Sequence, residues 1–452
     1  MTDARALIDA AWEERILPTL AEYTRIKCLS PAFDAAWADH GAILAAAELL
    51  QAWTREQDGG LQTEIVQLPG RTPVLLVENG GVGDPVLVYG HMDKQPPLGD
   101  WRPGLAPFEP VREGDLLYGR GTADDGYALF AAVIALLAAD GGRGRVIILI
   151  EASEESGSPD LSAYVEHLQD RIGTPSLVIC LDSGCLSYDR LWLTSSLRGN
   201  LVASVRVDVL TEGVHSGVGG GVVPSSFRIL RRILSRIEDE ATGEILLPEL
   251  LGNGVPDELR ASLTAVAQAF ADTALPTVDG LRLLGETPAD RLIGRAWSAA
   301  LEVTGMDGVP AVRDGGNVLR PFTTAKISLR LPPDVDAQEA ADALISAITT
   351  DEGAHITIDL EGAADGWLAP PLDAPSRAAL DRISQASFGQ PVGFHGEGGT
   401  IPFLADLKRS FPHTQFVATG VLGPHSNAHG PNEFLHIPMA KAVTYAVAEL
   451  LR

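Results

Sequence analysis

Cysteine, basic residues and long apolar runs are all scarce in this chain of 452 residues. The three cysteines, Cys28, Cys180 and Cys185, are too few to stabilise so long a chain through disulfide bonds. Their small, odd number indicates a reducing compartment, so we expect a cytoplasmic protein. The longest apolar stretches fall well short of the roughly 20 residues that a membrane span needs. The N-terminal residues mix both charges without an apolar segment behind a basic one, so no secretory signal is predicted.

Acidic residues outnumber basic ones by a wide margin. Lys and Arg total 34 and Asp and Glu total 60, so the formal net charge is −26. Such a surface repels phosphate backbones and anionic lipids, which argues against nucleic acid and membranes as the main partners. Acidic side chains in this number favour cations instead.

The patterns of the first 200 residues alternate between strands and helices. The segment RVIILIEA at 145–152 is apolar almost throughout, as in a strand that is covered on both faces. Strands that alternate with helices predict crossover units and a largely parallel sheet. We expect strands at 72–78, 85–90, 145–152 and 176–182, and helices at 5–25, 41–53, 124–140 and about 160–170.

The pattern changes after Arg198. Residues 200–209 alternate apolar and polar side chains, as in a sheet with one solvent-exposed face. Further strands at 324–331 and 355–362 and helices at 223–238, 257–303 and 336–349 predict a small open sheet with helices on one face. A Pro-rich stretch at 366–376 leads back to the first pattern, with helices near 375–388 and 438–451 and a strand at 414–420. We therefore predict one domain formed by 1–199 and 365–452, interrupted by an inserted domain at 200–364.

Residue types that bind metals follow the predicted strands. His91 and Asp93 follow one strand, Glu154 and Glu155 another, and Asp182 a third. Asp124 precedes a helix, and His429 lies in a polar loop after the last strand. Because the carboxyl ends of strands in an open α/β sheet meet at one edge, these side chains are expected to converge.

Each of these signals taken alone also has an ordinary structural explanation. His91 and Asp93 fit a surface turn, adjacent Glu154 and Glu155 fit a solvated strand end, and Asp124 fits a helix N-cap. Together, however, Asp124, Glu155 and Asp182 would repel one another unless cations compensated their charge. Two divalent ions that share a carboxylate would balance it.

These motifs, taken in order along nearly the whole chain, resemble the M20 family of dinuclear metallopeptidases, and most closely its carnosinase and cytosolic non-specific dipeptidase branch. The resemblance implies an α/β catalytic domain of the zinc-peptidase type with a mixed central sheet, and an inserted α+β, ferredoxin-like lid that carries a homodimer interface. The segments that carry it are GHMD (90–93), YGRGTADDG (118–126), EESGS (154–158), Asp182, HSGVGGG (215–221), EGGTIP (397–402) and AHGPNE (428–433).

The resemblance also implies a role for each matching residue. His91 and Asp182 would bind one metal, Glu155 and His429 the other, and Asp124 would bridge both, with a cis peptide bond to the next residue. Glu154 would be the general base and Asp93 would orient the histidine ligand. His215 would stabilise the oxyanion across the dimer, and Arg330, together with Gly399 and Thr400, would bind substrate. Arg330 also fits an ordinary exposed strand residue.

Three positions depart from the pattern of that branch. Gly396 stands where an arginine is usual, which leaves open how the substrate terminus is held, and Thr400 stands where serine is usual. Lys94 replaces a small apolar residue after Asp93, so it is either a cation near the metal site that favours acidic substrates or a solvated loop lysine.

The sequence therefore predicts metal-dependent hydrolysis of the amide bond of dipeptides or short peptides, with Glu154 as the base. Two divalent ions are expected, Zn²⁺ first, with Mn²⁺ or Co²⁺ also compatible with His and carboxylate ligands. One alternative is an N-acyl amino acid deacylase or desuccinylase of the same family. Another, from a different class, is a non-catalytic dimeric binding protein. A serine hydrolase is disfavoured because no G-x-S-x-G elbow is present.

Overall fold

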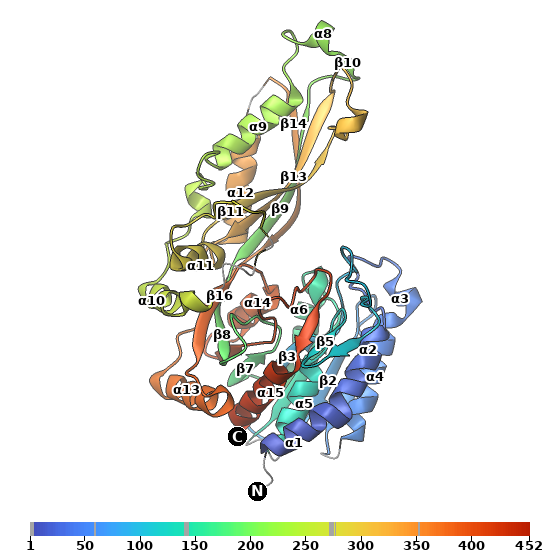
Figure 1. Ribbon diagram of the computed structural model, residues 1–452, viewed down its shortest axis with the longest axis vertical. Helices are drawn as coiled ribbons and strands as arrows, with labels where there is room; N and C mark the ends of the chain where they lie inside the picture. The colour runs from blue at the N-terminus through green and yellow to red at the C-terminus, as the bar shows by residue number, and fades with distance from the viewer. Residues whose placement is uncertain (1–3, 58–59, 140–143, 271–274, 276, 351–352) are drawn as a thin grey trace.

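A computed structural model describes residues 4–57, 60–139, 144–270, 275, 277–350 and 353–452. Figure 1 shows two bodies stacked along the long axis, a broad one that holds both chain ends and a narrow one that projects from it. Among the described residues, no helix is both long enough and apolar enough to cross a bilayer.

A mixed nine-stranded sheet forms the centre of the broad body. Its strand order is β1-β2-β6-β3-β7-β17-β8-β15, and β16 pairs with β8. Strands β6, β3, β7 and β17 run parallel, whereas the pairs at both ends include antiparallel ones, so the mixed sheet implied by the resemblance is confirmed. The strands are β1 (Gln62–Val66), β2 (Val74–Glu78), β3 (Val86–His91), β6 (Val146–Glu151), β7 (Leu177–Cys180), β8 (Trp192–Leu197), β15 (Trp367–Leu368), β16 (Gly393–Glu397) and β17 (Gln415–Ala418).

Helices cover both faces of this sheet. Strand β6 shows the consequence, because Ile148 and Ile150 lie in one apolar core while Ile147 and Leu149, pointing the other way, lie in a second. This is why the sequence of β6 is apolar at nearly every position. Helices α1 (Ala4–Ala11), α2 (Leu17–Arg25), α4 (Ala42–Glu56), α5 (Ala128–Ala138) and α15 (Ile437–Leu451) contribute to the first core, and α6 (Leu161–His167) and α14 (Pro402–Ser410) to the second.

The narrow body, which we call the lid, is built on a four-stranded antiparallel sheet of order β11-β13-β9-β14. Leu201, Ala203, Val205 and Val207 on β9 are buried while the residues between them are partly exposed, as the alternation in the sequence predicts. Strand β13 and two amphipathic helices supply most of the other residues of the lid core. The elements are β9 (Gly199–Asp208), β11 (Ala300–Asp307), β13 (Phe322–Leu331), β14 (His355–Ala364), α9 (Ser226–Ile237) and α12 (Ala337–Ile348).

One part of the lid's chain segment returns to the broad body. Helices α10 (Asp257–Val266) and α11 (Pro288–Ala296) pack on β16, and Leu259, Leu263 and Leu292 belong to the core of the broad body. The helical spacing between 257 and 303 predicts these helices but not which core they join. They flank the junction of the two bodies (Figure 1).

The remaining elements are short or peripheral. They are α3 (Trp37–His40), β4 (Val111–Glu113), β5 (Leu116–Tyr118), α7 (Gln169–Ile172), β10 (Val214–His215), α8 (Ser216–Gly219), β12 (Val318–Leu319), α13 (Ala374–Phe388) and β18 (Phe434–His436), with single helical turns at Trp12–Ile16, Glu154–Ser156, Pro248–Leu250, Ala267–Ala269 and Val312–Asp314.

Candidate metal centre

The candidate ligands converge because three neighbouring parallel strands end at the same edge of the sheet. Strand β3 ends at His91, β6 leads into Glu154 and Glu155, and β7 leads into Asp182. Asp124 reaches this edge from the loop before α5, which begins at Ala128 rather than at the predicted residue 124. The peptide bond between Asp124 and Asp125 is cis, as the resemblance implied.

Gly90 allows the loop before α5 to approach β3 closely. A Cβ atom at Gly90 would lie 2.6 Å from Oδ2 of Asp125. That oxygen accepts a hydrogen bond from the backbone N–H of His91, at 3.2 Å. The loop that carries Asp124 is thereby fixed against the strand that carries His91.

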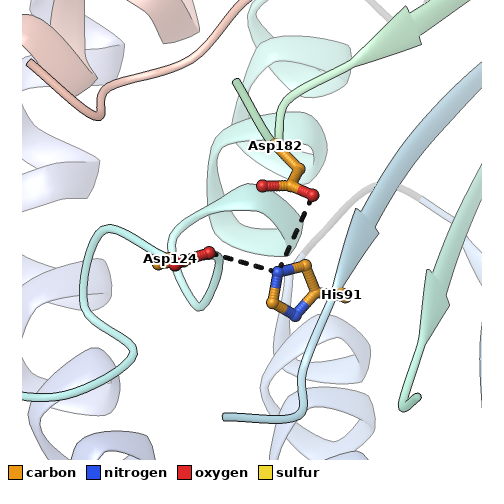
Figure 2. A group of neighbouring side chains, drawn as sticks. All are labelled: His91, Asp124 and Asp182. Atoms are coloured by element: carbon orange, nitrogen blue, oxygen red, sulfur yellow. Dashed lines mark ion pairs between the residues drawn. The ribbon is translucent and has the colours of Figure 1, made fainter. Parts of the chain in front are cut away.

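Two groups of potential ligand atoms meet at Asp124. In the first group, Nε2 of His91 lies 3.3 Å from Oδ1 of Asp124 and 3.9 Å from Oδ2 of Asp182 (Figure 2). In the second, Nε2 of His429 lies 3.1 Å from Oδ2 of Asp124 and 3.2 Å from Oε2 of Glu155. In each group one ligand atom from every residue lies within 4.8 Å of the others. Asp124 gives one oxygen to each group, which is the arrangement of a bridging carboxylate.

The donor set fits divalent cations. The Nδ1 atom of His91 faces Asp93, 3.1 Å from its backbone oxygen and 3.4 Å from its Oδ1. The Nε2 atom is buried and has no hydrogen-bond partner among the described residues, so it is directed toward Asp124 and Asp182 as a ligand would be. Imidazole and carboxylate ligands suit zinc, manganese or cobalt.

The electrostatics of the two groups favour a cation. Burial, with Asp124 and Glu155 nearby, raises the pKa of Asp182 to about 7. Burial opposes the charge on His429, but Asp124 and Glu155 outweigh it and raise the pKa of His429 to about 11. The carboxylates thus attract positive charge strongly, and cations bound here would replace protons on the imidazoles.

Asp93 positions both sides of the centre from a completely buried location. Its Oδ1 accepts a hydrogen bond from the backbone N–H of Glu154 at 3.1 Å, and its Oδ2 accepts one from that of Glu155 at 3.0 Å. The carboxylate also faces Nδ1 of His91. One side chain therefore orients the histidine and holds the turn that presents the two glutamates.

A buried ion pair, which the sequence analysis did not find, joins the two loops that carry Asp124 and His429. Arg120 pairs with Glu433 and also donates a hydrogen bond to the backbone oxygen of Gly430, at 2.8 Å. Glu433 accepts a further bond from the backbone N–H of Gly121, at 2.9 Å. Arg120 and Glu433 both lie inside motifs that carry the resemblance, which is the signal that could have identified them.

Both interpretations of Lys94 made from the sequence are wrong. The side chain is completely buried, neither near a site opening nor in a solvated loop. Its Nζ donates hydrogen bonds to the backbone oxygens of Tyr23 and Ile26, both at 2.8 Å, and to that of Thr24 at 3.3 Å. Lys94 therefore caps the end of α2 and fixes the loop that follows Asp93.

The other candidate residues lie on or beside the lid. Within one chain His215 is not brought to the metal groups, because β10 lies at the far end of the lid (Figure 1). Arg330 and Thr400 do come together, with Nη1 of Arg330 donating to Oγ1 of Thr400 at 3.2 Å. Gly399, next to Thr400, is exposed and lines a cavity formed by α11, β16 and the loops that hold Gly184 and Leu422.

Sequence reasoning assigned no role to Glu397 or to two arginines beside this cavity. Oε1 of Glu397 accepts hydrogen bonds from the backbone N–H of Gly184 and from the hydroxyl groups of Ser183 and Thr194, at 2.7–2.9 Å. These bonds connect β16 to the loop that holds Asp182. The arginines, Arg198 and Arg295, lie far from these residues in sequence, and only the fold reveals their proximity.

Comparisons with known proteins identify the family of the chain. A model of the family described as peptidase family M20/M25/M40 matches residues 87–452. The chain is 28% identical over 381 residues to a cysteinylglycine-S-conjugate dipeptidase of Corynebacterium striatum, covering 80% of this chain and 81% of that protein. It is 26% identical over 380 residues to the human Beta-Ala-His dipeptidase, covering 80% and 73%. The solved structure of the dipeptidase Dug1p from Saccharomyces cerevisiae superposes with a TM-score of 0.80 at 22% identity, covering 100% and 98%.

Proposed function

The chain belongs to peptidase family M20/M25/M40, and from this premise we propose that it is a metal-dependent dipeptidase. The single observation that carries the proposal is the pair of ligand groups that share Asp124. The relatives named above are dipeptidases, which favours dipeptides over N-acyl amino acids as substrates. The presence of the full ligand set and of Glu154 disfavours a non-catalytic binding protein.

We propose two divalent cations per chain, with Zn²⁺ as the first choice. His91, Asp124 and Asp182 would hold one, and Asp124, Glu155 and His429 the other. When bound, such cations supply Lewis acidity, which polarises a carbonyl group and makes water more acidic.

Glu154 is placed to move the proton of the reaction. Its Oε2 lies 4.0 Å from Nε2 of His91, at the edge of the first ligand group, and its side chain is largely buried. In the proposed reaction Glu154 accepts a proton from water as the water oxygen bonds to the carbonyl carbon. The C–N bond then breaks, and Glu154 gives that proton to the leaving amine nitrogen. Asp93 keeps Glu154 in place through the backbone bond described above.

We also propose that the lid, within the predicted span 200–364, forms a homodimer that brings His215 of one chain to the site of the other. Support comes from the tip of the lid, where Val218, Val222 and Val312 expose most of their surface. Sedimentation that showed a monomer at working concentration would contradict this role for His215.

A reducing, cytoplasmic location remains part of the proposal. The three cysteines are buried and unpaired. Buried, unpaired cysteines act as small apolar packing groups. The Sγ of Cys28 also donates a hydrogen bond to the backbone oxygen of Met92, at 3.2 Å.

The decisive test is the variant Glu154→Gln. We expect it to bind the metals normally, because Glu154 is not in either ligand group, and to lose about 10²–10⁴-fold in kcat on dipeptides. Glu166→Gln, an exposed glutamate on α6, is the matched control and should keep full activity. Metal content and turnover are measured on the same samples, with panels of dipeptides and N-acyl amino acids. Near-normal turnover of Glu154→Gln would exclude it as the base, and turnover of N-acyl substrates alone would exclude a dipeptidase.

A further inference from the structure

Three arginine side chains meet at the junction of the two bodies. Arg198 lies in the crossing from β8 to β9, Arg295 is on α11, and Arg330 is on β13 of the lid. All three surround the segment Gly398–Thr400. A Cβ atom at Gly398 would lie 2.8 Å from Nη2 of Arg198 and 3.4 Å from Cγ of Arg295, and Arg330 donates to Thr400.

These guanidinium groups contact only neutral groups among the described residues. Arg198 donates to the backbone oxygen of Ser298 at 2.9 Å, and Arg330 to the hydroxyl of Thr400. Arg295 makes no hydrogen bond or ion pair there and stacks over the ring of Phe270, and its buried Nε has no partner. Burial, together with Arg330 and Arg295, lowers the pKa of Arg198 to about 10. Glu397 lies close enough to Arg295 to favour its charge, but among the described residues no carboxylate forms an ion pair with any of the three arginines. Partly buried like charges without ion-pair partners are costly, so the cluster suits an anionic ligand.

The charge balance indicates how much negative charge the ligand carries. Among the described residues that line the adjacent cavity of about 320 Å³, Glu397 is the one carboxylate and Arg295 the one arginine, with Arg198 and Arg330 beside it. One oxygen of Glu397 already accepts three hydrogen bonds. Three arginines against one glutamate leave a net charge of about +2. The cavity also includes Gly184, two residues beyond Asp182, so a ligand here lies beside the metal centre.

We propose that Arg198, Arg295 and Arg330 form a site for two carboxylates, which selects dipeptides whose C-terminal residue is aspartate or glutamate. Arg330 with Thr400 receives the α-carboxylate, and Arg295 with Arg198 receives the side-chain carboxylate. This inference rests on the proposed dipeptidase function. Guanidinium groups suit the task because they bind carboxylates in a planar, bidentate manner.

The test compares Ala-Glu with its neutral isostere Ala-Gln. The wild-type enzyme should prefer Ala-Glu by about 10–100-fold in kcat/KM, the range expected for a charge-assisted hydrogen bond, and mainly through KM. Arg295→Gln should abolish the preference and Arg295→Lys should restore part of it. Arg260→Gln, which removes an exposed arginine on the neighbouring helix α10, is the matched control and should keep the preference.

Calorimetric binding of free glutamate and glutamine to the wild-type chain, to Glu154→Gln and to Arg295→Gln provides a readout that does not need turnover. Tighter binding of glutamate, lost in Arg295→Gln, supports the dicarboxylate site even if no dipeptide is cleaved, in which case the proposed function alone fails. Hydrolysis of dipeptides with equal kcat/KM for Ala-Glu and Ala-Gln, together with equal binding of the two amino acids, overturns this inference and leaves the proposed function intact.

Discussion

Breaking the buried ion pair between Arg120 and Glu433 tests most directly how the loops of the metal centre are held together. The variant Arg120→Met keeps the apolar stem but removes the cation. Glu433, which is completely buried, then loses its charged partner, and the backbone oxygen of Gly430 loses a donor. Breaking a buried pair from one side costs about 3–5 kcal/mol of unfolding free energy.

The pH dependence of this loss has a definite sign. In the intact protein burial raises the pKa of Glu433 to about 7, against an ordinary value of 4.5. A carboxyl group whose folded pKa is raised contributes most to stability below its unfolded pKa, and that contribution falls as the pH rises through the folded value. Without Arg120 the folded pKa rises further. The variant should therefore lose less stability at pH 6 than at pH 8.

The assay is urea unfolding followed by tryptophan fluorescence, with a chelator present so that metal binding does not contribute. None of the seven tryptophans belongs to the core of the lid, so the signal reports the broad body. Arg112→Met breaks an exposed pair with Glu13 and should cost less than about 1 kcal/mol. A loss below about 1 kcal/mol for Arg120→Met, or one that is the same at both pH values, would refute the reasoning.

Two further substitutions test the groups that position the ligands. Asp93→Ala removes the acceptor that holds the backbone of Glu154 and Glu155, and should weaken metal affinity about 10–100-fold in a titration with Zn²⁺. Unchanged affinity would show that the turn keeps its conformation without Asp93. Lys94→Met leaves three backbone oxygens at the end of α2 without their donor, and should lower the unfolding free energy by about 2–4 kcal/mol in urea; a neutral effect would show that water replaces the ammonium group.

The strands with a clear apolar or alternating pattern were predictable because periodicity is a local property of the sequence, whereas β1, β8 and β16 were not predicted. The predicted run at 145–152 and the observed β6 differ by one residue at each end, since both faces of that strand are covered and every side chain before Glu151 is apolar. Once parallel strands are expected, His91 and Asp182 must meet at one edge. The sequence therefore contains most of the first ligand group, although the roles given to the individual residues remain proposals.

Contacts between distant segments could not be predicted in this way. The amphipathic pattern of α10 and α11 requires an apolar partner but does not say that the partner is β16. Arg198 and Arg295 are separated by almost a hundred residues, and neither lies in one of the motifs that carry the resemblance. Likewise, His429 has a positive φ of 64°, a conformation set by its folded loop and not by residue type.

The three arginines of the proposed anion site belong to parts of the molecule that need not move together. Arg295 is anchored on a helix packed against the broad body, Arg330 is on the lid sheet, and Arg198 occupies the crossing between them. Any rotation of the lid about that crossing would change the spacing of the guanidinium groups. A doubly charged ligand would then bind tightly at one lid angle and weakly at others. The charge of the substrate and the orientation of the lid would therefore be thermodynamically linked.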